Sequence, residues 1–279
     1  MLKSFGIKVK KKLKKLYNYI ASRTYKFLTL RLYYPGYYRW HAKKPIQEKK
    51  VLFCEVRSLA ITDSFKLLIE KFAREGYTTE CHCLGETNVG VVSYAKNSLR
   101  FLKSMATARY VCISDACNVT SCVEKRPETI LVQLWHACGA FKKFGYSTAE
   151  LIFGVNRKQM DRYPYYKNLN YITVSSPEVS WAYEEAMNSE KFGSKVVATG
   201  VSRTDVFFDE SFTEDARATL YTAVPQARGK KLILYAPTFR GGVRSAKSPD
   251  VLDIADLREA LGDDYFLLIK HHPFVRHPP

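Results

Sequence analysis

From residue 51 onward, short apolar runs alternate along the chain with amphipathic stretches of helical period. Apolar runs bounded by Gly, Pro or polar clusters are typical of strands, whereas apolar positions three or four apart are typical of helices. The pattern predicts strands at residues 51–56, 78–84, 110–113, 130–135 and 171–174, and helices at 61–74, 91–105 and 177–187. This alternation predicts an α/β fold with a parallel sheet covered by helices.

A second unit is predicted to begin near residue 195. We expect strands at 196–198, 231–235 and 265–269, and helices at 214–221 and 253–261. Three strands are too few to form a sheet covered on both faces, so we expect this second unit to be incomplete. The predicted division is residues 1–50 as a basic segment and linker, 51–194 as a first domain and 195–279 as the start of a second.

The first 50 residues carry most of the positive charge. They hold fifteen Lys and Arg and one acid, a net +14 of the +17 of the whole chain. Residues 1–28 fit one amphipathic helix with seven lysines between Lys3 and Lys15, broken afterwards by Pro35 and Gly36; residues 43–50 fit a linker. A basic amphipathic helix followed by aromatics favours an anionic membrane surface.

Two alternatives for this segment remain: docking of the helix on its own domain, and a nucleic-acid arm. Nucleic acid ranks last because the other 229 residues carry only a net +3. No run reaches the roughly 20 apolar residues that span a bilayer, and the charged start is not followed by the apolar core of a signal peptide. Seven scattered cysteines without zinc-ligand spacing are expected to be buried, reduced thiols of a cytosolic protein.

Candidate chemistry lies where predicted strands end. His136 follows the run 130–135 and His272 follows 265–269, and open α/β sheets bind ligands at the carboxyl ends of their strands. A core or surface histidine is the ordinary alternative for each. Two further turns offer phosphate-binding groups: the loop of Gly139, Lys142 and Lys143, and the Thr238 to Gly242 turn with Arg240, which also fits an ordinary turn with an exposed arginine. Arg203 and Asp205 form a weaker corner, and an alternative role for them is to cap the next helix.

The order and spacing of these motifs resemble those of the CDP-glycerol glycerophosphotransferase family, the teichoic acid primases and polymerases of Gram-positive bacteria. The resemblance rests on four segments: Gln133 to His136 with Gly139 and Lys142 to Gly145, Gly200 to Asp205, Leu234 to Arg240, and Lys270 to Pro273. It implies a fold similar to GT-B glycosyltransferases, with two Rossmann-like domains and a nucleotide held mainly by the second. It also implies a peripheral membrane protein at the cytoplasmic face.

The resemblance implies roles for individual residues. His136 matches the proposed base that activates the acceptor hydroxyl, and His272 matches a histidine near the donor phosphates. Thr238, Arg240, Lys270 and Arg203 are expected to bind phosphate, with Asp205, Gly139, Lys142 and Lys143 in support. This sequence has Ala137-Cys138-Gly139 where many members have Gly-Thr-Pro, and the family is expected to continue for roughly another hundred residues after the Lys270 to Pro273 corner.

We therefore predict a transferase that moves glycerol phosphate or ribitol phosphate from CDP-glycerol or CDP-ribitol to a hydroxyl of a lipid-linked glycan or teichoic acid chain, releasing CMP. No cofactor and no metal site are expected. One alternative is a GT-B enzyme that uses a UDP-sugar. The other is an inactive remnant that only binds membrane or partners.

Overall fold

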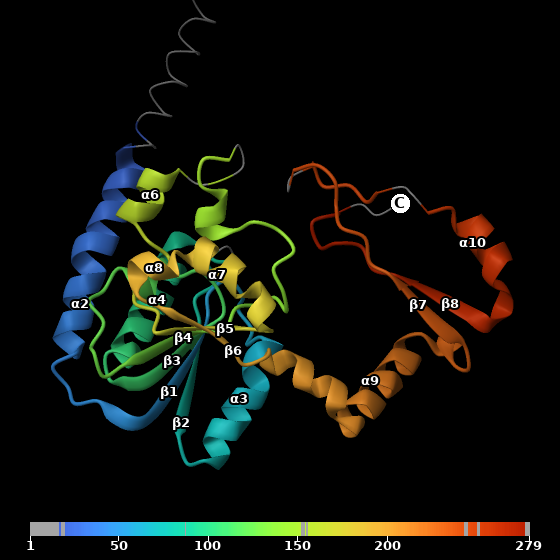
Figure 1. Ribbon diagram of the computed structural model, residues 1–279, viewed down its shortest axis with the longest axis horizontal. Helices are drawn as coiled ribbons and strands as arrows, with labels where there is room; N and C mark the ends of the chain where they lie inside the picture. Colours follow the sequence, from blue (N-terminus) through green and yellow to red (C-terminus); the bar gives the residue numbers. More distant parts are fainter. Residues whose placement is uncertain are drawn as a thin grey trace, which may run out of the picture. The chain divides into compact units, whose positions relative to one another are not determined.

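The computed structural model describes Tyr17 and residues 20–86, 88–151, 154, 156–242, 245–249 and 252–276. The chain folds as two compact units, the first ending at Asp205 and the second beginning at Val206 (Figure 1). The predicted lysine-rich helix start, Lys3 to Lys15, lies outside the described residues.

The first unit is built on a six-stranded sheet whose strand pairs are all parallel, as predicted. The strand order is β2-β1-β3-β4-β5-β6. The strands are β1 (Gln47–Glu55), β2 (Thr78–Cys83), β3 (Ala108–Ile113), β4 (Ile130–Gln133), β5 (Tyr171–Val174) and β6 (Lys195–Ala198). Because every strand is parallel, their carboxyl ends meet at one edge, and the loops that follow them are gathered there.

Helices cover both faces of this sheet (Figure 1). Val51 and Phe53 of β1 pack on α3 (Asp63–Arg74), whereas Leu52 and Cys54 face the larger cluster that includes α4 (Val91–Met105). This alternation follows from the two-residue period of a strand. The remaining helical segments of the unit are α5 (Asn118–Ser121), η2 (Gly145–Thr148), α6 (Arg157–Arg162), η3 (Pro177–Val179), α7 (Ser180–Met187) and α8 (Ser189–Phe192).

The amino-terminal helix does not end at Pro35 and Gly36, contrary to the prediction. Residues 20–27 are helical and continue through a π-helical segment, η1 (Leu28–Tyr33), into α2 (Tyr34–His41). Pro35 lacks a backbone N–H and lies in the first turn of α2, directly after the π-helical segment, so the helix continues past it through an irregular turn. Tyr34 and Tyr38 are almost fully buried in the core, so the described part of the helix docks on its own domain.

Two predicted boundaries shift because of strand pairing. Residues 47–50, expected to be linker, form the start of β1, where Gln47 is paired with Ala108. β6, expected to open the second domain, pairs along its length with β5 and completes the first sheet. The boundary therefore falls after Asp205 rather than before Lys195.

The second unit contains α9 (Glu210–Ala223), η5 (Pro225–Ala227), β7 (Lys231–Tyr235), α10 (Ile254–Leu261), η7 (Gly262–Asp264) and β8 (Tyr265–Ile269). A further helical segment, η4 (Ser202–Phe208), spans the boundary between the two units. β7 and β8 pair in parallel, from Lys231 with Tyr265 to Tyr235 with Ile269. Asp209 caps α9 by accepting a hydrogen bond from the Phe212 N–H, so the cap predicted for Arg203 or Asp205 falls to a later residue.

All seven cysteines are free thiols. Cys54, Cys112 and Cys117 are buried as expected, but Cys81 and Cys138 are exposed. Within the described part of the chain, no helix has the length and apolarity to cross a membrane.

Candidate active site

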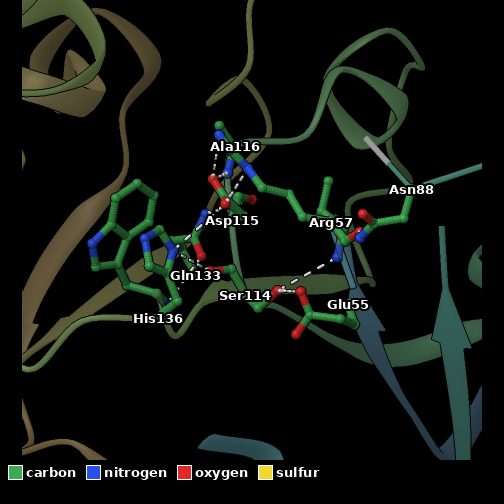
Figure 2. Close-up of polar contacts among 10 residues, drawn as sticks. Glu55, Arg57, Asn88, Ser114, Asp115, Ala116, Gln133 and His136 are labelled. Carbon is green, nitrogen blue, oxygen red and sulfur yellow. Dashed lines mark hydrogen bonds and ion pairs between the residues drawn. The ribbon is translucent and has the colours of Figure 1, made fainter. Parts of the chain in front are cut away.

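His136 lies just beyond β4, at the edge of the first sheet where the strands end (Figure 2). The chain turns sharply before it, because Trp135 adopts a left-handed backbone with φ of 60°. Such a conformation is costly for a large side chain and persists only where its surroundings hold it. Here the side chain of Gln133 holds it: Oε1 accepts from the Trp135 N–H at 3.0 Å, while Nε2 donates to the Asp115 carbonyl at 3.0 Å.

The imidazole of His136 is oriented through its Nδ1 atom. Nδ1 lies 3.3 Å from the Ser114 carbonyl oxygen and 3.6 Å from Asp115 Oδ2. Both neighbours are acceptors, so the geometry places the ring proton on Nδ1 and leaves the lone pair on Nε2. The side chain is about half exposed, and the Trp135 ring lies against it with centroids 4.3 Å apart. A half-exposed imidazole with a free Nε2 lone pair is suited to accept a proton from a bound hydroxyl.

Asp115 is the buried member of this arrangement. Its side chain is only 6% exposed, and a carboxylate so buried requires partners. The Ala116 N–H donates to Oδ1 at 2.6 Å, and Arg57 Nε lies 2.6 Å from Oδ2. Arg57, Asp115 and His136 therefore form one connected row (Figure 2).

Ser114, the neighbour of Asp115, makes a second set of contacts with the end of β1. The Ser114 hydroxyl donates to the buried carboxylate of Glu55 at 2.8 Å and accepts from the Val56 N–H at 3.4 Å. Asn88 donates to the carbonyl of Arg57 at 2.8 Å. The ends of β1 and β3, which carry Arg57 and Asp115, are thereby tied together.

Arg203, predicted to bind phosphate, contacts the same site. Its guanidinium donates to the His136 carbonyl at 2.8 Å and lies 3.9 Å from Asp63 Oδ2. The pKa of Asp63 is lowered by its hydrogen bond with Lys66, and Arg203 adds to that effect. Asp205 is exposed.

The loop after His136 combines one anchored and several exposed residues. Phe144 stacks on Trp135 with centroids 4.7 Å apart, and Gly145 adopts a left-handed backbone with φ of 52°. Lys142 and Lys143 are exposed, and Gly139 is half-buried. Phe141 is 97% exposed, so this loop presents one ring and two cations to solvent.

The second unit brings together three of the predicted donor-site residues. Arg240 donates to the Thr238 hydroxyl at 2.8 Å, and the backbone of Arg240 pairs with Lys247 to close the loop. The His272 ring packs against both Phe239 and Phe274, with centroids 4.7 and 4.8 Å away. Its Nδ1 accepts from the Phe274 N–H at 3.2 Å, so the proton of the neutral ring lies on Nε2, where it can donate to an anion. Lys270 is exposed.

Sequence reasoning missed Arg57, Ser114 and Asp115. A usable signal was present, because Arg57 and Asp115 each come within two residues of the end of a strand. Open α/β sheets bind ligands at the carboxyl ends of their strands, and this rule points to Arg57 and Asp115 as well as to His136. Among the described residues, no group of three or more His, Cys, Asp or Glu could hold a metal ion.

The fold and this site define an α/β protein with its candidate catalytic groups at the carboxyl ends of parallel strands. Residues 36–279 match the CDP-Glycerol:Poly(glycerophosphate) glycerophosphotransferase family, and the chain belongs to that family. The family prediction made from the sequence motifs is confirmed.

Curated relatives are teichoic acid enzymes. The chain is 32% identical over 237 residues to the teichoic acid ribitol-phosphate primase of Bacillus spizizenii, an alignment that covers 83% of this chain and 60% of that protein. It is 36% identical over 244 residues to the teichoic acid poly(ribitol-phosphate) polymerase of the same organism, covering 83% of this chain and 37% of the relative. The chain thus spans little more than half, or less, of the length of these relatives.

Among solved structures, the wall teichoic acid polymerase TagF is similar in fold. The TM-score is 0.63 at 17% sequence identity, over 95% of this chain and 64% of that one. This likeness confirms the predicted GT-B-like α/β fold.

Proposed function

We propose that this chain transfers a polyol phosphate from CDP-glycerol or CDP-ribitol to a hydroxyl of a lipid-linked glycan or teichoic acid chain, releasing CMP. Family membership and the teichoic acid primase and polymerase relatives support this reaction. One structure of a TagF variant was obtained with CDPG, which supports a CDP-polyol as donor. The observation that carries the proposal is the free Nε2 of His136, held at the sheet edge by Ser114 and Asp115.

In the proposed reaction His136 acts as general base. Nε2 accepts the proton of the acceptor hydroxyl while its oxygen forms a bond to the β-phosphorus of the donor. The bond between that phosphorus and the bridging oxygen breaks, and CMP leaves with the electron pair. Asp115, beside Nδ1, stabilises the imidazolium that forms. A positioned base of this kind contributes about 100-fold to 10,000-fold to a rate.

The donor phosphates are proposed to bind in the second unit. Arg240 offers a planar fork of N–H groups that suits phosphate oxygens, and it is already held beside the Thr238 hydroxyl. His272 Nε2–H and the exposed Lys270 add two further donors. We propose that these groups stabilise charge as the bridging oxygen departs.

The test is CMP release by the purified full chain with a panel of CDP-glycerol, CDP-ribitol and UDP-sugars. We expect CMP only from a CDP-polyol, and a loss of at least about 100-fold in kcat for His136→Ala. His271→Ala is the matched control, since His271 bonds Ser248 and has no assigned role. Turnover of a UDP-sugar alone favours the sugar transferase, no turnover with any donor favours the inactive remnant, and normal turnover by His136→Ala contradicts the role of His136.

We also propose that the chain works at the anionic, cytoplasmic face of the membrane. Support comes from the +14 charge of residues 1–50 and from the exposed apolar residues of the described helix, among them Ile20, Leu28 and Leu32. Cations near an anionic leaflet contribute about 1 kcal/mol each. Binding to phosphatidylglycerol vesicles that falls on neutralising Lys3 to Lys15 is the expected result, and unchanged binding at low salt would contradict it.

A further inference from the structure

A small basic pocket lies between the amino-terminal helix and α6, apart from the His136 row. Its volume is about 180 Å³. Cationic, aromatic and apolar side chains line it together, including Arg31, Arg162, Lys167, Tyr163 and Leu30. Figure 1 shows α6 lying beside this helix, and Arg31 joins the two by donating to the Arg162 carbonyl at 2.5 Å.

Three cations gather around the ring of Tyr163. Lys26 Nζ lies 4.7 Å from the ring centroid, and the guanidinium carbons of Arg31 and Arg162 lie 5.8 and 5.6 Å from it. The ring draws these like charges together through cation–π attraction. Like charges brought so close repel one another, so the cluster gains stability when an anion enters.

The protein supplies little negative charge to balance this cluster. Within the described ranges, none of Lys26, Arg31, Arg162 and Lys167 forms an ion pair with a carboxylate. The one acid that lines the pocket, Asp161, is occupied by Lys191 at 2.5 Å. Burial lowers the pKa of Lys26, and the charge of Glu86 opposes this only in part. The lining of the pocket therefore carries a net positive charge.

The same helix exposes apolar side chains close in sequence to Arg31. Phe27, Leu28 and Leu32 are 40%, 49% and 56% exposed. A ligand that contacts both the cationic pocket and these apolar side chains must have an anionic group joined to an apolar portion. A soluble polyol-phosphate chain would fill the cationic pocket and leave these apolar residues in water, whereas a phospholipid would cover both.

We propose that this pocket binds the phosphodiester headgroup of an anionic phospholipid, with the acyl chains beside Phe27, Leu28 and Leu32. The inference deepens the proposed membrane attachment and rests on it. The proposed membrane attachment rests on the overall positive charge of residues 1–50. The present inference adds a specific headgroup-binding site in the folded first unit. Arg31, Arg162 and Lys167 are exposed, so salt is expected to weaken their contacts with the headgroup.

The first test compares two double variants with equal loss of charge. Arg31→Gln with Arg162→Gln removes the pocket cations, and Arg39→Gln with Lys158→Gln removes exposed cations of α2 and α6. Binding to phosphatidylcholine vesicles with and without phosphatidylglycerol is measured by co-sedimentation at low and high salt. We expect the pocket variant to lose at least about tenfold in affinity for phosphatidylglycerol vesicles at low salt, and the control to lose about threefold or less. Equal losses would overturn the proposal.

A neutral substitution separates pocket geometry from net charge. Tyr163→Leu removes the ring that gathers the cations without changing the charge, and Tyr163→Phe keeps the ring. We expect Tyr163→Leu to weaken phosphatidylglycerol binding and Tyr163→Phe to retain it, with thermal melts confirming that both fold. Full binding by a folded Tyr163→Leu, or stronger competition by a soluble glycerol-phosphate oligomer than by short-chain phosphatidylglycerol, would refute a lipid site.

CMP release from a soluble acceptor is measured on the same variants. Loss of vesicle binding with normal CMP release supports the headgroup site independently of the chemistry. An absence of CMP release from every variant and from the parent chain would contradict the proposed reaction and leave the vesicle result standing.

Discussion

Nδ1 of His136 lies 3.6 Å from Oδ2 of Asp115, a nearly buried carboxylate oxygen that also pairs with Arg57 Nε at 2.6 Å. The two residues come from different strands' ends, 21 positions apart in sequence. The relationship assigns Asp115 a positioning role: it holds the His136 ring in the tautomer that leaves Nε2 free.

Asp115→Asn tests that role. The amide can present its NH₂ group to Nδ1, which favours the wrong tautomer, so we expect kcat to fall by about 100-fold or more with little change in the KM for the donor. The KM for the donor is measured alongside, because a positioning role lowers kcat without weakening donor binding. A folded Asp115→Asn with unchanged kcat would exclude the role.

Arg57→Gln should destabilise the first unit. It leaves the buried Asp115 carboxylate without its cation, and we expect a loss of about 2 kcal/mol in the free energy of unfolding. Lys71→Gln is the matched control, since its ion pair with Glu75 is exposed on both sides and is worth about 0.5 kcal/mol or less. Urea unfolding measures the free energy of unfolding of both variants. Equal losses would mean that Arg57 does not stabilise the buried Asp115 carboxylate.

Gly145→Ala should be poorly tolerated. The backbone there has φ of 52°, and a Cβ atom would come within 2.2 Å of the Ala186 carbonyl oxygen. We expect destabilisation of about 3 kcal/mol or more. At Gly193, where φ is 72° and nothing lies within 4 Å of the added Cβ, Ala should cost only about 1 kcal/mol. Similar melting temperatures for the two variants would mean that the Ala186 contact is unimportant.

His82 should make stability depend on pH in the mildly acidic range. Burial lowers its pKa from the usual 6.5, and the hydrogen bond with Glu80 offsets this only in part. The unfolded chain therefore binds a proton that the folded chain does not, so stability is full above pH 6.5 and falls as the pH drops below it, until the folded ring also protonates. In His82→Gln the urea midpoint of unfolding should depend less on pH below 6.5. If the slope of midpoint against pH is unchanged, other groups cause the pH dependence.

Arg240→Lys tests the donor site. Lysine keeps the charge but loses the planar fork, so we expect the KM for the CDP-polyol to rise by about tenfold. Arg228→Lys, which removes a guanidinium stacked on Tyr221 in the same unit, is the control and should leave that KM unchanged. If both variants bind the donor normally, Arg240 does not contact it.

Much of the architecture could be read from the sequence, because its strands are short apolar runs and its helices have apolar positions three or four apart. β5, β7 and β8 and the helix α4 have the predicted bounds. The ordered motifs around His136, Arg240 and His272 also sufficed to predict the family, since their chemistry depends on local strand-to-loop turns.

The sequence by itself therefore determined the elements, the α/β class, the family and the candidate residues that follow its most apolar strands. Only the tertiary structure decided that β6 belongs to the first sheet and that the helix runs through Pro35. It alone also decided that Asp115, paired with Arg57, lies beside His136. The physical reason is the distance along the sequence over which each effect acts. Local period and composition act over a few residues, whereas these outcomes depend on strand order and burial, which join residues tens of positions apart.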